Sequence, residues 1–413
     1  MVNKIFIIYS PLLILSLIWC IVFFLYFLNP FDLPMVRIST LLIILSGLFS
    51  IIAGYLTPKF LDEGIGVKKS SIITAEFPFD ISTLKKVLFV LTLISFIGLT
   101  GKMYLFIQQL QDVSSYFLKP NFVRKEFIRA EMGELSINKP LFKLFSHMGS
   151  LNPMTVVLGG VLAALPVKRS RFLSVLPVII AALYSIALLQ RVYFVKNYIV
   201  WMATSYLTIY FIPDQLKQVA KRIFIKRILI FTFMVAFFLF FVLIIRHVFV
   251  LGSDLNKLMN SFYFYTAGPI FLLDKYLVSD QPLHHGASLF RSFVHWFISL
   301  DLMEKSALIP QHYEFYRIYN TIGNVFTYVR IPYEDFGIYG VIAVSYIWGW
   351  ISYLVISKYL SGFSFFRIGF AAMIIMSFFW SFYGYAWSHS IGIIIMFAHL
   401  ALVDLYFRHC LKR

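Results

Sequence analysis

The chain has 413 residues, of which 60% are apolar and only 13% are charged. Soluble domains are typically about 45–50% apolar and about 25% charged, so this composition excludes an ordinary soluble globular protein. The two cysteines, Cys20 and Cys410, lie in the first apolar run and close to the last residue. This placement argues against a disulfide framework and against a thiolate metal site. We therefore expect an all-α, polytopic membrane protein.

Long apolar runs recur along the chain, and runs of about 18 or more almost uncharged residues are typical of transmembrane helices. Lys4 precedes the first run, and no small-residue cleavage site follows it, which predicts an uncleaved anchor with a cytoplasmic N-terminus. We predict one integral membrane domain over residues 1–413, with both termini cytoplasmic and ten spans, at 5–28, 38–57, 87–107, 150–166, 172–189, 193–212, 228–250, 337–357, 368–386 and 390–407.

The net charge of +17 is explained by this topology. Lys and Arg gather in the segments placed inside, such as residues 167–171 and 214–227, whereas residues 29–35, placed outside, contain neither. Such an asymmetry follows the positive-inside rule, so the basic balance predicts no nucleic acid partner. No G-x-x-x-x-G-K-[ST] sequence occurs, which argues against ATP-driven transport.

The two longest segments between spans both face outward in this topology. Residues 108–149 contain a predicted interfacial helix that begins near Asn121 and places Arg124, Lys125 and Arg129 in its first turns. This basic segment is expected either to rest on lipid headgroups or to hold a phosphorylated lipid substrate. Residues 251–336 form a large external loop, which we expect to carry the active site.

The large loop alternates charged side chains with tyrosines. Aromatic rings bind the apolar faces of sugars, and Arg binds phosphate groups in a bidentate manner, so the loop suits a sugar phosphate substrate. Neither H-E-x-x-H nor D-x-D occurs in the chain, and we expect neither a metal nor another cofactor. The charged and polar residues of interest here are His284, His285, Arg291, His295, His312, Arg317, Asn324, Arg330, Glu334 and Asp335.

The strongest local signal is the stretch from Asn324 to Gly340, which reads NVFTYVRIPYEDFGIYG and ends the loop at the start of the eighth span. Together with Tyr265-Thr-Ala-Gly-Pro269 and with Arg191 between two spans, it resembles the O-antigen and capsular repeat-unit polymerase family (Wzy-type). A simpler explanation of the motif is a helix start, with Asp335 as the cap of the span and Gly337 and Gly340 easing helix contact.

The resemblance implies a GT-C-like helical glycosyltransferase of the bacterial inner membrane that joins polyprenyl-diphosphate-linked oligosaccharides without a metal. Its partners would be a chain-length regulator and a flippase. We expect His312 or Asp335 to act as the base, and Arg191, Arg291 and Arg317 to bind the diphosphate. Arg124 and Arg129 would hold the second lipid, while Asn324 and Tyr333 would contact substrate. A ligase of the O-antigen type and a flippase for lipid-linked oligosaccharides remain alternatives.

Overall fold

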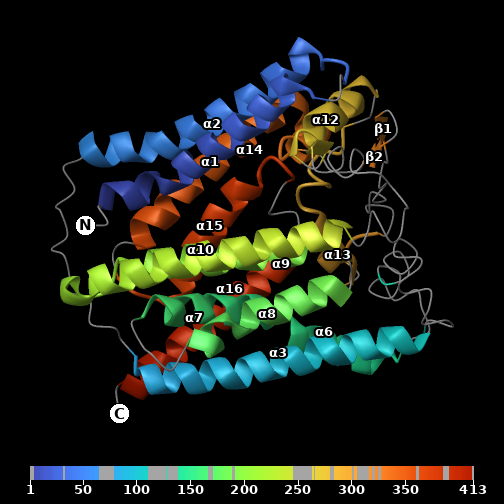
Figure 1. Ribbon diagram of the computed structural model, residues 1–413. Helices are drawn as coiled ribbons and strands as arrows, with labels where there is room; N and C mark the ends of the chain where they lie inside the picture. Colours follow the sequence, from blue (N-terminus) through green and yellow to red (C-terminus); the bar gives the residue numbers. More distant parts are fainter. Residues whose placement is uncertain are drawn as a thin grey trace. The chain divides into compact units, whose positions relative to one another are not determined.

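The computed structural model describes residues 4–30, 33–64, 79–109, 127, 138–165, 171–187, 191–244, 263–264, 266–279, 283–299, 302–304, 316–318, 321–323, 327–359, 362–384 and 390–411 (Figure 1). The chain divides into two compact units. The first unit comprises Met1–Ile72, Leu255–Ser361 and Ile374–Ile394, and the second comprises Ile73–Asp254, Gly362–Met373 and Ile395–Arg413. The prediction of a single membrane domain stays a prediction.

Helices dominate both units. In the first unit they are α1 (Lys4–Leu28), α2 (Ile38–Gly64), α12 (Gly268–Val278), α13 (Arg291–Ser299) and α14 (Arg330–Tyr359). In the second unit they are α3 (Ile81–Gln109), α6 (Lys139–Gly149), α7 (Asn152–Ala164), α8 (Arg171–Ala187), α9 (Arg191–Ile209) and α10 (Asp214–Ile244). The division between the units falls within α15 (Phe365–Trp380) and α16 (Ser390–Leu411).

Two short strands complete the described structure of the first unit. β1 (Tyr316–Ile318) and β2 (Thr321–Gly323) pair in antiparallel fashion, with Arg317 opposite Ile322. This hairpin belongs to the loop that was predicted to carry the active site.

Among the residues that the structure describes, four helical segments are long and apolar enough to cross a membrane: Ile7–Leu28, Ile38–Phe60, Ile81–Gln108 and Arg330–Ser357. In a bilayer each backbone N–H and C=O needs a partner within the protein, and a continuous helix supplies one. The expectation of an α-helical membrane protein is therefore confirmed at this level. Arg171–Ile186 and Phe365–Trp380 are shorter apolar helices, and the full set of ten spans stays a prediction.

Glycines bring two helices of the first unit into backbone contact. A Cβ atom added at Gly54 of α2 would collide with the Tyr346 carbonyl of α14, and one added at Gly349 would collide with the Ile51 carbonyl. Small residues allow this close approach in membrane proteins. Figure 1 shows α2 and α14 running side by side, so α2 gives the start of α14 a rigid support.

The second unit has its own core around α7, which is buried along almost its whole length. Gly160 of α7 lies against α9, and Ser205 donates a hydrogen bond of 3.0 Å to the Gly160 carbonyl. Trp201 of α9 donates from its indole to the Ser174 carbonyl of α8 at 2.9 Å.

Asp80 precedes α3 and accepts hydrogen bonds from Thr83 and Ser82, which hold the pKa of its carboxyl below the ordinary value.

Candidate functional site

The candidate site forms where a turn of the large loop, residues 283–290, docks onto the start of α14. The backbone N–H of His284 donates to the Glu334 carbonyl at 3.0 Å, and that of His285 donates to the Asp335 carbonyl at 3.1 Å. In an uninterrupted helix these two carbonyls would accept from Ile338 and Tyr339. The turn can bind them because α14 is interrupted just after Asp335.

The interruption is at Gly337, whose φ of 63° and ψ of −151° are not helical. This region of backbone conformation is essentially restricted to glycine. No atom lies within 4 Å of the position that a Cβ would take at Gly337, so the requirement for glycine comes from the backbone alone. Gly340 serves differently, because a Cβ there would collide with the Pro332 carbonyl, where the chain folds back on itself. Pro332 fits the first turn, since a proline lacks only an N–H that would have no helical partner there.

Asp335 fastens the same turn with its side chain. The side chain is fully buried, and its two oxygens accept the backbone N–H groups of Ser288 at 3.0 Å and Leu289 at 2.6 Å. Asp335 therefore caps the turn before α13 rather than α14, the helix to which it belongs. Its predicted role as the base stays a prediction.

A chain of polar contacts runs from the turn to α12. His284 Nδ1 lies 2.9 Å from the Ser288 hydroxyl and 3.8 Å from Glu334 Oε1. The same Glu334 oxygen lies 3.5 Å from Nη2 of Arg330, one helical turn earlier. The guanidinium carbon of Arg330 is 4.6 Å from the ring centre of Tyr276 in α12, which is a cation–π distance.

The turn itself has an unusual backbone. His285 has a φ of 49° and Gly286 a φ of 94°, both in the left-handed region. A histidine at positive φ is uncommon, and such residues cluster at functional sites when the surrounding structure holds them in place. Here the hydrogen bonds to the residue 334 and 335 carbonyls do so.

These residues form one wall of an open pocket of about 910 Å³. A further part of the lining comes from Phe290, just before α13, and from Phe293, Val294 and Phe297 of α13, which recur with the spacing of an amphipathic helix. A volume of this size suits a small-molecule ligand, and the lining is mostly apolar, with four phenylalanines. The lining residues are Leu283, His284, His285, Gly286, Ala287, Phe290, Phe293, Val294, Phe297, Met303 and Phe336.

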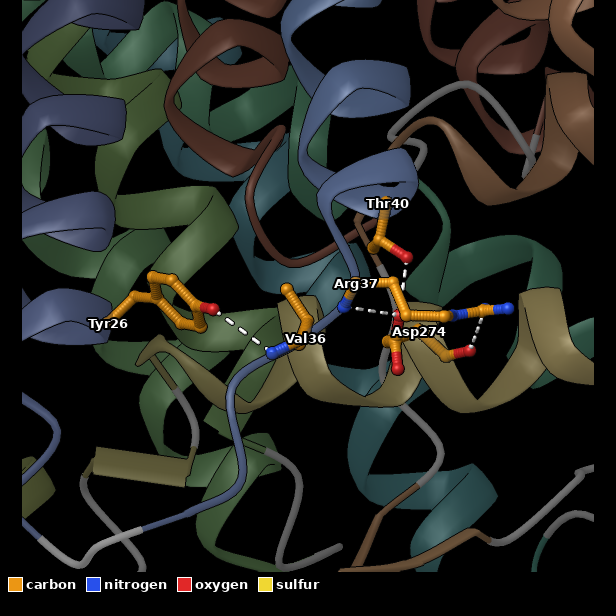
Figure 2. A network of polar contacts seen from close by, with 5 residues as sticks. All are labelled: Tyr26, Val36, Arg37, Thr40 and Asp274. Atoms are coloured by element: carbon orange, nitrogen blue, oxygen red, sulfur yellow. Dashed lines mark hydrogen bonds and ion pairs between the residues drawn. The ribbon is translucent and has the colours of Figure 1, made fainter.

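A second polar network, shown in Figure 2, fixes α12 to the start of α2. Asp274 Oδ1 accepts hydrogen bonds from the Arg37 backbone N–H at 3.2 Å, from Arg37 Nε at 3.1 Å and from the Thr40 hydroxyl at 2.5 Å. Arg37 also donates to the Asp274 carbonyl at 2.9 Å, and the Tyr26 hydroxyl accepts from Val36 N–H at 3.1 Å. Asp274 thus caps α2 from another helix, and α12 is held between α2 and Arg330 of α14.

Some of the predicted site residues lie in the elements that form the pocket, and others do not. Asp335 and Tyr333 lie in the first turns of α14, and Arg291 begins α13, so these three belong to the elements of the pocket. Arg317 lies in β1 of the first unit, and Arg191 begins α9 of the second unit. Arg124, Arg129, His312 and Asn324 lie outside the described residues.

The sequence analysis missed the aromatic wall and the partners of His284. The wall had a readable signal in the spacing of Phe290, Phe293, Val294 and Phe297. The approach of the 283–290 turn to Glu334 and Asp335 had none, because it depends on the break at Gly337. Within the described ranges no group of three or more His, Cys, Asp or Glu side chains is arranged to hold a metal ion.

Comparison of the chain with protein-family models, with curated proteins and with solved structures finds no match.

Proposed function

We propose that the chain is a membrane glycosyltransferase that joins polyprenyl-diphosphate-linked oligosaccharide repeat units into an O-antigen, capsular or exopolysaccharide. In this proposal the chain has ten spans and a GT-C-like architecture, with both termini in the cytoplasm of a bacterium. The large loop then lies on the outer face of the inner membrane, where such polymers are assembled.

The pocket between the 283–290 turn and α13 carries the proposal. Its aromatic wall suits both the isoprenoid end of a lipid-linked sugar and the apolar faces of sugar rings. Its polar wall offers the imidazole of His284, backed by Glu334 and Arg330. An apolar surface beside a small set of polar groups is the arrangement expected for an amphipathic ligand.

Glycosyl transfer from a diphosphate requires cations for the departing phosphates and a base for the acceptor hydroxyl. Arg291 begins the helix that forms the pocket wall, and Arg317 lies in the same loop. We propose both for the diphosphate, with Arg191 as a third candidate and Arg124 and Arg129 for the second lipid. The reaction is proposed to be metal-free, so a chelator should leave it unchanged; inhibition that added divalent ion reverses would contradict this.

Deletion of the gene tests the proposal through the glycans that accumulate. Loss of a polymerase leaves single repeat units on the cell surface, whereas loss of a ligase leaves long chains on the carrier lipid. Loss of a flippase leaves neither outside the cell. We expect single units, and either of the other two patterns would refute polymerisation.

A pocket variant links this phenotype to the site. Phe293→Asp places a charge in the apolar wall and should fail to restore long chains. Leu216→Asp makes the same chemical change at an exposed position of α10 that does not line the pocket, and it should restore them. Equal complementation by both variants would separate the function from this pocket.

A further inference from the structure

We propose that His284 accepts the proton of the acceptor sugar hydroxyl, with Ser288 and Glu334 as the residues that orient its ring. This inference rests on the proposed function and offers a residue of the pocket wall for the role of the base, for which His312 and Asp335 were the predicted residues.

The pocket wall limits the choice. Of its described lining residues, His284 and His285 are the two whose side chains can act as a proton acceptor. His285 is held through its backbone in a left-handed conformation, and His284 is the one whose ring contacts both a hydroxyl and a carboxylate. Asp335, which stays a predicted base, is fully buried and binds the N–H groups of Ser288 and Leu289, and its side chain is not among those that line the pocket.

The contacts of His284 favour a proton on Nδ1. Nδ1 lies 2.9 Å from Ser288 Oγ, which can accept a hydrogen bond from it, and the negative Glu334 carboxylate lies on the same side of the ring, with Oε1 at 3.8 Å from Nδ1. A proton on Nδ1 leaves Nε2 with a free electron pair, which is the form that a general base needs. This is the arrangement in which a carboxylate fixes and supports a catalytic imidazole.

With this tautomer, proton transfer to Nε2 accompanies the transfer of the glycan. Nε2 takes the hydroxyl proton while the hydroxyl oxygen bonds to the anomeric carbon of the donor glycan. The bond from that carbon to the diphosphate oxygen breaks, and its electron pair leaves with the diphosphate. The resulting imidazolium is stabilised by Glu334 and later returns its proton to water.

The pH dependence of the rate reports on this arrangement. The groups that face the ring are Ser288 on its own turn and Glu334 on α14, with Arg330 on the far side of Glu334 and Tyr276 of α12 beyond Arg330. The Asp335 carboxylate is occupied by backbone N–H groups. Glu334→Gln removes the carboxylate that faces the ring, so the dependence of the rate on pH should differ from that of the wild type.

The test uses the full-length protein in detergent or liposomes with a polyprenyl-diphosphate-linked repeat unit as substrate. His284→Gln should lower kcat by roughly 100-fold or more with little change in KM, which is the usual contribution of a general base. His284→Ala should be partly rescued by added imidazole. His147→Gln, the same substitution in α6 of the second unit, is the matched control and should have wild-type kinetics.

Three outcomes would overturn the inference. These are a His284→Gln rate close to the wild type, an unchanged pH profile in Glu334→Gln, or no imidazole rescue of a folded His284→Ala. If His284→Gln does not fold, the pH profile of Glu334→Gln decides. An active wild type with an active His284→Gln would refute this role alone, whereas an inactive wild type would refute the proposed function as well.

Discussion

Gly337→Ala isolates the contribution of the helix break to the site. At this position no atom lies within 4 Å of the added methyl group, so the substitution creates no collision with another residue. What changes is the backbone, because φ 63° and ψ −151° are unfavourable for any residue with a Cβ. Holding alanine there costs about 1–3 kcal/mol.

This energy cost lowers the population of the bent form of α14 relative to a straight helix. Since about 1.4 kcal/mol corresponds to a factor of ten, the bent form should become roughly 5- to 150-fold less favoured relative to a straight helix. In the straight form the Glu334 and Asp335 carbonyls would accept hydrogen bonds from N–H groups of the helix itself. The backbone N–H groups of His284 and His285 would then lose their acceptors. The turn would then detach from α14.

The assay measures two quantities for each variant in detergent, the polymerisation rate and the thermal unfolding temperature. Gly337→Ala should lower both, and Gly362→Ala should change neither, because its Cβ would have only Arg367 Nη1 nearby at 3.7 Å. A Gly337→Ala protein with wild-type activity and wild-type unfolding temperature would refute the role assigned to the break.

Three further predictions concern hydrogen bonds and ion pairs that hold the elements of the site in place, and the arginines proposed to bind the diphosphate. Asp335→Asn leaves one N–H of the turn without an acceptor and should destabilise the protein by about 1–3 kcal/mol, measured as a lower unfolding temperature in detergent; an unchanged temperature would contradict the capping role. Arg37→Ala and Asp274→Ala should show a coupling of about 1 kcal/mol or less in a double-mutant cycle, because the arginine is exposed; purely additive effects would contradict the ion pair between the two side chains. Arg191→Ala and Arg317→Ala should stop chain growth without impairing membrane insertion, and wild-type glycan ladders from either variant would remove that arginine from the site.

The membrane character of the chain could be predicted because hydropathy acts locally. The apolar runs at 5–28, 38–57 and 87–107 lie within α1, α2 and α3, with boundaries that differ by a few residues. The eighth span was predicted to begin at 337, and α14 is interrupted at that residue, with a short helical segment before it that starts at Arg330. The residues before Gly337 are polar, and hydropathy alone does not distinguish a short polar helix from a loop.

The motif around Asp335 could be located but not fully interpreted. Its position at the junction of loop and span was readable, and Gly340 does permit a close contact, although with Pro332 of the same segment. The role of Gly337 depends on a positive φ, and the role of Asp335 depends on donors 46 and 47 residues earlier in the chain. Such long-range hydrogen bonds leave no periodic signal in a single sequence.

The proposed function is tested most directly by purified protein in liposomes, supplied with a synthetic polyprenyl-diphosphate-linked repeat unit and a chelator. The account predicts a ladder of longer lipid-linked glycans together with released polyprenyl diphosphate. Intact single units after prolonged incubation, with protein that remains folded, would contradict it.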